Sequence, residues 1–220
     1  MTVTAEHHPA FEEYCECIYE LREDNLEVIQ ARIAERLDVS RPSVSEMIHR
    51  MESENLVSLT ANKISLTDKG ESLAARVVRR HRIAERFLSD TLGLSWSLAH
   101  HEACKWEHVL TPETEDAIFK LMNMPTTCPH GNPIPGSAYV QPDHTALSKI
   151  GAGCQFTISR IIEEIEDKSS VLDFLQQSNM LPGVAGTVVK LHSDGSRTVA
   201  VDGSEVTVDA FVSARIFVLA

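Results

Sequence analysis

The feature that most constrains the fold is a short helix followed at once by a second, well-capped helix. Residues 28–37 (VIQARIAERL) place apolar side chains at three- and four-residue steps, which predicts a helix. After a short turn, Ser40 stands at an N-cap position, and Pro42 lies in the first helical turn, where its missing N–H does no harm. Apolar residues then recur on one face as far as Met51. Two helices joined by so short a turn predict a helix-turn-helix.

The elements around this motif predict a winged DNA-binding domain. Residues 9–24 have helical apolar periodicity. The segment LVSLTANKISLTDKG alternates apolar and polar residues on both sides of Ala61-Asn62, which predicts a β-hairpin. Each element alone is common, but three helices followed by a hairpin within about sixty residues favour a winged helix-turn-helix.

The capped helix is expected to enter the major groove of DNA with its N-terminal end. Its candidate contacts to phosphates and base edges are Ser40, Arg41, Pro42, Ser43 and Ser45, with Glu46 and His49 further along. Backbone phosphate could also be reached by Arg32, Arg50 and Lys63. The alternative for Arg32 and Arg50 is that they are solvated surface residues with no contact to DNA. The net charge of −12 argues against a protein that coats nucleic acid without specificity, although six acids balance six bases over residues 28–70.

The rest of the chain changes from helical to β patterning. Helices are predicted at 67–92, 95–110 and 112–122, and helices in this place commonly dimerise a winged domain. Short strands with turns at Ser193-Asp194-Gly195 and Asp202-Gly203, plus one helix near 169–178, predict a small five-stranded SH3-like barrel. The predicted fold is thus mainly α with β, in four parts: a winged domain (1–74), a helical metal-binding and dimerisation domain (75–124), a proline-rich linker (125–144) and the barrel (145–220).

Targeting signals and disulfides are not expected. No segment approaches the roughly 18 to 20 apolar residues of a membrane span, and the start of the chain lacks the features of a secretory signal. We therefore expect a cytoplasmic protein without a membrane partner. Five cysteines are an odd number without framework spacing. Packing is the better interpretation of Cys15 and Cys17, and Cys154 carries no functional signal.

Potential metal ligands gather on three predicted helices. Helical spacing places His81 and Glu85 on one face, and Glu13 and Glu16 on one face of the first helix. Carboxylate, imidazole and thiolate groups suit a divalent first-row transition metal. A single His/Glu pair is usually a solvated face, but here a second helix adds several donors. These are His100, Cys104, Glu107 and His108.

Three longer motifs resemble one known family. RRHRIAERFL, then HHEACKWEHVL, then HGNPIPG look like the diphtheria toxin repressor family, whose members are iron- and manganese-dependent regulators. The resemblance covers nearly the whole chain, including IYEL and ARIAERL. It implies a winged-helix domain, a helical dimerisation domain and an SH3-like domain. It also implies a homodimer that represses metal-homeostasis genes by binding near-palindromic double-stranded operators.

The resemblance also implies a primary metal site. The family's ligands fall on Glu13, Cys104, Glu107 and His108, and its manganese branch adds the positions of Glu16 and His81. The chain is a hybrid, because its acids resemble the manganese branch whereas its cysteine resembles the iron branch. Glu13 and Glu16 are carboxylates where the iron branch has non-acidic residues, and they favour Mn²⁺. The Cys104 thiolate favours softer ions such as Fe²⁺, Co²⁺ or Zn²⁺. We predict Mn²⁺, with an iron-dependent repressor as the alternative; Co²⁺, Ni²⁺, Zn²⁺ or Cd²⁺ could substitute in vitro.

A second site is implied around Glu85. His81 and His100 match iron-branch ligands, whereas Cys128 and His130 resemble a pair that some manganese-responsive members use beside Glu85. A barrel carboxylate, Glu166 or Asp167, could complete the coordination. Which site His81 serves stays open, and linker rigidity is the alternative for Cys128 and His130.

Two other functions are alternatives to a metal-dependent repressor. A metalloenzyme would need an open coordination position beside a substrate pocket, and the sequence has neither an H-E-x-x-H motif nor a glycine-rich phosphate loop. A metal-independent winged-helix regulator would bind DNA equally well in the presence of a chelator. We predict a repressor that is not an enzyme.

Overall fold

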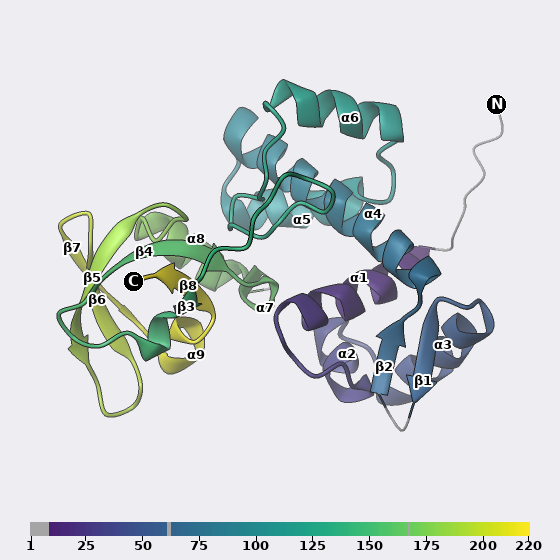
Figure 1. Cartoon of the computed structure of the whole chain (residues 1–220), viewed down its shortest axis with the longest axis horizontal. Coiled ribbons are helices and arrows are strands. Elements are labelled where there is room, and N and C mark those ends of the chain that lie inside the picture. Colours follow the sequence, from purple (N-terminus) through teal and green to yellow (C-terminus); the bar gives the residue numbers. More distant parts are fainter. Residues whose placement is uncertain (1–8, 61–62, 167) are drawn as a thin grey trace. The chain divides into compact units, whose positions relative to one another are not determined.

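The computed structural model describes residues 9–60, 63–166 and 168–220, and they form two compact units (Figure 1). The first comprises the described residues up to Arg80 together with Glu107–Leu110, and the second comprises His81–Trp106 and the rest of the chain from Thr111. The boundary falls inside one long helix. In the described ranges, no helix is long and apolar enough to cross a membrane.

The first unit has the predicted winged helix-turn-helix. Its core is formed by apolar side chains such as Ile18, Ile33 and Ile48. The Ser40 hydroxyl caps the third helix by accepting a hydrogen bond from the Ser43 N–H at 3.2 Å, as the sequence predicts. The elements are α1 (Pro9–Glu23), α2 (Gln30–Arg36), α3 (Arg41–Ser53), β1 (Val57–Thr60), β2 (Lys63–Leu66) and the start of α4 (Asp68–Arg86).

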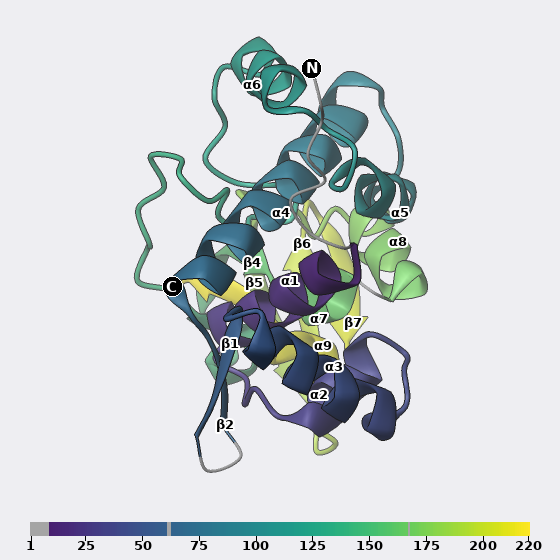
Figure 2. The same ribbon diagram turned by 90° about the vertical axis from the view of Figure 1, so that its right-hand side faces the viewer.

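The two strands of the wing are antiparallel, with Val57 opposite Leu66 and Thr60 opposite Lys63. They run side by side next to the first three helices (Figure 2), with β2 in contact with α1 and β1 in contact with α3. The predicted turn at residues 61–62 lies outside the described residues. The wing is therefore held by the same core as the helix-turn-helix.

The second unit begins with the remainder of α4 and further helices. A π-helical turn, η1 (Phe87–Thr91), follows α4, and then come α5 (Trp96–Trp106) and α6 (Pro112–Leu121). α6 has an apolar face, yet none of its residues is buried in the single chain. Because an exposed apolar helix face is costly in water, α6 presents a surface suited to association.

The proline-rich segment after α6 forms an ordered loop. A bridge between Thr127 and Pro133 closes it, and the His130 carbonyl accepts a hydrogen bond from the Ile161 N–H at 2.8 Å. Gly131 has φ +89°, and a methyl group there would collide with the Ser159 carbonyl oxygen. Only glycine allows the loop to approach the sheet so closely.

A six-stranded antiparallel sheet forms the C-terminal domain. Its strand order is β3-β8-β4-β5-β6-β7, so the expectation of five strands is wrong by one. Its core includes Phe156, Val188 and Ile216, together with Trp96 from α5. The strands are β3 (Thr145–Ala146), β4 (Gln155–Ile161), β5 (Ala185–Leu191), β6 (Arg197–Val201), β7 (Ser204–Val208) and β8 (Ile216–Leu219). The helices are the 3-10 turn η2 (Leu147–Lys149), α7 (Glu163–Glu166), α8 (Ser169–Gln177) and α9 (Ala210–Ser213).

Candidate metal centres and DNA-binding surface

The N-terminal end of α3 offers an exposed polar surface. Arg41, Pro42 and Ser43 are exposed, and Ser45 is half-buried, while Val44 points into the core. Side chains in the first turn of a recognition helix are those that reach base edges. The predicted contact residues of this turn are therefore accessible to DNA.

The other predicted DNA contacts differ in their exposure and in the side chains that they contact. The Arg50 guanidinium lies 5.6 Å from the centre of the Phe11 ring, and His49 Nδ1 lies 3.7 Å from a Glu52 carboxylate oxygen. Arg50 thus has a packing role besides any contact with phosphate. The remaining predicted residues lie in three elements: Arg32 is half-buried in α2, Glu46 is exposed in α3, and Lys63 is exposed in β2.

In the first unit, His108 lies among three carboxylates. Its Nδ1 is 2.7 Å from Glu12 Oε2, and its Nε2 is 3.2 Å from Glu107 Oε1 and 3.4 Å from Glu13 Oε1. Hydrogen bonds to Glu107, Glu12 and Glu13 raise the pKa of His108 to about 12. Without a metal, a proton on the imidazole offsets part of this negative charge. A dication would take the place of that proton. We refer to Glu12, Glu13, Glu107 and His108 as the His108 cluster.

The other predicted ligands of the primary site lie on α1 and α5. Glu16 is half-buried, one helical turn after Glu13 in α1. Cys104 is an exposed residue of α5 in the second unit, where its Sγ groups with ring nitrogens of His81 and His100. Glu12 was not predicted: the helical pattern pointed to Glu13 and Glu16, and the orientation of the Glu12 side chain depends on its contact with His108.

In the second unit, a buried cluster forms around Glu85, and we call it the Glu85 cluster. Glu85 Oε1 lies 2.9 Å from His100 Nδ1 and 3.2 Å from His81 Nε2. Glu85 Oε2 lies 3.6 Å from His130 Nδ1. The structure therefore brings His81 next to Glu85 within this unit. The remaining members are Cys128 and Glu166.

Glu166 and Cys128 lie on the other side of His130. His130 Nδ1 is 2.8 Å from Glu166 Oε2 and 3.9 Å from Cys128 Sγ. Glu166 is one of the two barrel carboxylates that the sequence suggested, and the other, Asp167, lies outside the described residues. The α7 helix that carries Glu166 was not predicted, because four residues are too few to give a periodic pattern.

The ionisation of the Glu85 cluster is set by burial and by mutual charge. Burial raises the pKa of Glu85, but His130, His81 and His100 outweigh it and hold that pKa well below its usual value. Burial and Glu163 raise the pKa of Glu166 well above its usual value. Burial opposes the imidazolium form of His130, yet Glu166 and Glu85 raise its pKa. Burial and the same two carboxylates raise the pKa of the Cys128 thiol to about 11.

Two buried contacts hold the cluster in place. Asn132 donates to Glu166 Oε1 at 2.5 Å and to the Ile161 carbonyl at 3.0 Å, and it accepts a hydrogen bond from Arg160 Nε. These partners fix which end of the Asn132 amide faces the carboxylate. In the second contact, Arg82 donates to Glu163 Oε1 at 2.6 Å and to the Pro133 carbonyl at 2.5 Å.

The donors of both clusters fit a divalent metal. In the Glu85 cluster, Glu85 Oε2 and His130 Nε2 are buried and have no hydrogen-bond partner within the described residues. Buried polar atoms rarely stay unpaired, so these two indicate a missing ligand. Carboxylate, imidazole and thiolate groups are the donors that first-row divalent ions prefer.

A winged helix-turn-helix joined to helices with clustered metal-binding side chains defines a class, the metal-regulated DNA-binding proteins. Sequence profiles agree: the iron-dependent repressor N-terminal DNA-binding domain matches residues 8–63, and the iron-dependent repressor metal-binding and dimerisation domain matches residues 67–136. The chain belongs to the iron-dependent repressor family, which includes the diphtheria toxin repressor. It is a metal-dependent transcriptional repressor, as the sequence predicted.

Individual relatives support this assignment. The iron-dependent repressor IdeR of Mycobacterium tuberculosis strain H37Rv is 37% identical over 206 residues, covering 88% of this chain and 89% of its own length. The diphtheria toxin repressor of Corynebacterium diphtheriae is 44% identical over 126 residues, covering 57% of this chain and 56% of its own.

Solved structures share the fold. A manganese-dependent transcriptional repressor in complex with manganese superposes with a TM-score of 0.86 at 27% identity, covering 96% of this chain and 99% of that one. The IdeR of T. acidophilum has a TM-score of 0.77 at 30% identity, covering 94% and 96%. Both iron- and manganese-dependent proteins are therefore relatives.

Proposed function

We propose that this repressor responds to Mn²⁺ and that the His108 cluster, with Glu16, forms the primary sensing site. The observation that supports this most directly is the position of His108 among Glu12, Glu13 and Glu107. Three carboxylates and an imidazole form a hard donor set, which favours Mn²⁺ over softer ions. Mn²⁺ here supplies positive charge that neutralises the carboxylates.

The ligands of this site come from two separate parts of the chain, so a bound metal can influence DNA binding. Glu13 belongs to α1, which packs in the core of the winged domain, and His108 follows the end of α5 by two residues. A dication held by both would restrict α1 relative to the chain that leaves α5. Coupling between effector and DNA is typically about 1–3 kcal/mol, and by linkage operator DNA tightens metal binding equally.

We also propose that two chains associate through the exposed apolar face of α6 and neighbouring residues of α5. Leu121 in α6 is 67% exposed and Leu98 in α5 is 45% exposed. A two-fold dimer would present two α3 helices to a near-palindromic operator with half-sites about one helical turn apart, roughly 34 Å. We place the protein in the cytoplasm and assign it no catalytic activity.

The test measures operator affinity against free metal. A DNA duplex selected from a random pool in the presence of Mn²⁺ serves as the probe for fluorescence anisotropy, titrated anaerobically with buffered Mn²⁺ or Fe²⁺. We expect Mn²⁺ to strengthen binding about 5- to 150-fold. His108→Ala should remain a folded dimer and lose this response. Equal DNA affinity after EDTA treatment would contradict metal regulation.

Iron is the second candidate, for a specific reason. The exposed Cys104 thiol brings a soft donor to α5, and softer donors favour Fe²⁺. A lower free Fe²⁺ than Mn²⁺ at half-saturation would establish iron as the effector. Under the manganese proposal, Cys104→Asp should retain the Mn²⁺ response.

A further inference from the structure

The outward face of α3 carries a carboxylate in the N-terminal half of the helix. Val44, Ile48 and Met51 form the buried stripe of α3. Successive residues of an α-helix are rotated by about 100°, so Glu46 lies almost opposite this stripe. Glu46 is exposed, as is His49 three residues later. If α3 packs its buried stripe on the core and enters the major groove with its other face, Glu46 points into the groove.

The charge of Glu46 is not neutralised by any side chain in residues 9–60, 63–166 and 168–220. Over these ranges its carboxylate makes no hydrogen bond or ion pair. The basic side chains three and four residues later lie against other groups. His49 Nδ1 is 3.7 Å from Glu52 Oε2, and the Arg50 guanidinium lies 5.6 Å from the centre of the Phe11 ring. Glu46 therefore meets DNA as a free carboxylate.

A free carboxylate beside DNA phosphates is unfavourable unless it accepts a hydrogen bond from a base. A carboxylate only accepts hydrogen bonds, and the major groove offers two base donors, the N4 amino group of cytosine and the N6 amino group of adenine. The adenine donor lies next to the N7 acceptor, which repels a carboxylate, whereas cytosine presents its donor alone. The pattern of donors therefore favours cytosine.

The serine hydroxyls at the start of α3 are less selective. Ser40 Oγ accepts a hydrogen bond from the Ser43 N–H at 3.2 Å and lies 2.7 Å from Ser43 Oγ, so both hydroxyls take part in the helix cap. A hydroxyl also donates and accepts, so it can bond to any of several bases. Glu46 is better suited than these serines to select one base.

We propose that Glu46 is a specificity-determining residue whose carboxylate accepts a hydrogen bond from the N4 amino group of a cytosine in each operator half-site. This role deepens the proposed function and rests on the entry of α3 into the major groove. Any other base at that position would leave the carboxylate unpaired close to phosphates. Replacing the cytosine in one half-site should therefore weaken binding about 5- to 150-fold.

The experiment selects operators from one random DNA pool with the full chain in Mn²⁺, for the wild type and two variants. Fluorescence anisotropy then measures the four base pairs at each position of one half-site. The wild type should prefer cytosine at one position. Glu46→Gln should prefer adenine there, because an amide both donates to N7 and accepts from N6. Glu46→Ala should bind the four duplexes with nearly equal affinity.

A base analogue isolates the proposed hydrogen bond. Replacing the preferred cytosine by 2-pyrimidinone removes the N4 amino group and keeps the ring. The wild type should lose affinity for this duplex, while Glu46→Ala should lose much less. Any weakening of the DNA duplex itself is common to both proteins, so the ratio of the two losses reports on the carboxylate.

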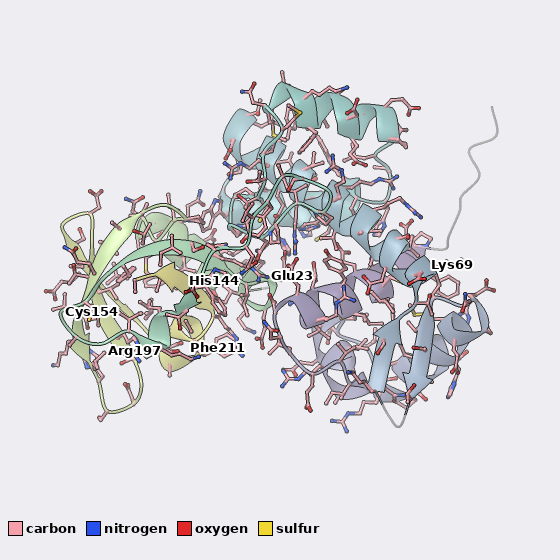
Figure 3. All side chains as sticks on the ribbon, in the orientation of Figure 1. Glu23, Lys69, His144, Cys154, Arg197 and Phe211 are labelled. Carbon is pink, nitrogen blue, oxygen red and sulfur yellow. The ribbon has the colours of Figure 1, made fainter. Side chains whose placement is uncertain are left out.

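Glu54→Gln is the matched control, because it removes the same charge from the other end of α3. Glu54 is the exposed C-cap of α3, about 12 Å from Glu46 along the helix axis. Its carbonyl accepts a hydrogen bond from Lys69, which is labelled in Figure 3. Removing a negative charge should strengthen binding to every duplex alike. The control should therefore keep the cytosine preference, and circular dichroism checks that every variant folds.

Three results would overturn the proposal. They are a wild-type operator without a preferred cytosine, an unchanged cytosine preference in the Glu46 variants, and an equal change in their affinity for all duplexes, including complete loss of binding. Metal regulation is tested separately, by the dependence of wild-type binding on Mn²⁺. If Mn²⁺ has no effect, the manganese proposal fails, and the same selection with Fe²⁺ or without metal still measures the base preference. Absence of DNA binding under all three conditions overturns both.

Discussion

The two clusters of potential metal ligands differ most in their exposure to solvent. In the His108 cluster, the Glu13 side chain is 51% exposed, and one protonated imidazole offsets part of the negative charge. In the Glu85 cluster, Glu85 and His130 are fully buried, and buried partners hold the ligands in place. An open site can exchange ions with solvent, whereas a buried one is costly to leave unfilled. The comparison supports the proposal that the first cluster is the sensing site, because its ligands are open to solvent.

The largest expected effect follows from removing the central charge of the buried cluster. Glu85→Gln leaves the histidines of the cluster without their main counterion, and breaking a buried ion pair costs about 3–5 kcal/mol. The matched change in the open cluster, Glu13→Gln, should cost under about 1 kcal/mol, because exposed ion pairs contribute little. Urea unfolding in EDTA measures both. Similar losses for the two variants would show that burial does not distinguish the clusters.

A smaller effect should follow from the backbone that carries the buried ligands. Gly131→Ala places a methyl group against the Ser159 carbonyl at a φ of +89°, whereas Gly153 has a similar φ of +81° and open space around it. Left-handed strain alone costs of order 1–3 kcal/mol, and both variants should share it. Gly131→Ala should lose additional stability and weaken the binding of divalent metal by the Glu85 cluster. Equal losses of stability and of metal binding in the two variants would show that the close approach of the Gly131 loop to the sheet does not support the cluster.

The sequence and the family resemblance named the members of the buried cluster, whereas in the open cluster they missed Glu12. Periodicity identified α1 and α3, but it predicted a helix as far as residue 110, whereas α5 ends at Trp106 and Glu107 and His108 lie in the turn that follows. The position of Glu166 depends on α7, which is too short to show a pattern and is held by the buried ion pair between Arg82 and Glu163. Those two residues are 81 positions apart in the chain.

Asn132 is a second residue whose role depends on tertiary contacts that the sequence does not show. It lies alone in a proline-rich segment, and only the folded chain reveals its contacts with Glu166 and Arg160. Local spacing finds ligands that share a helix. Ligands that converge through tertiary contacts, and the residues that orient them, need the structure.

The smallest effect concerns a histidine outside both clusters, His144, which is labelled in Figure 3. Burial and the charge of Arg160 lower its pKa, opposite to the shifts of His108 and His130. A histidine whose pKa is lower in the folded state contributes stability above its unfolded pKa, about 6.5, and that contribution is lost as the pH falls through its folded pKa. Acidification from pH 8 to pH 5 in EDTA should therefore destabilise the wild type slightly more than His144→Gln. The difference between the two proteins cancels the contributions of the other histidines, and urea unfolding at both pH values measures it. A larger acid loss in His144→Gln would mean that His144 gains a proton on folding, as the carboxylate-bound histidines do.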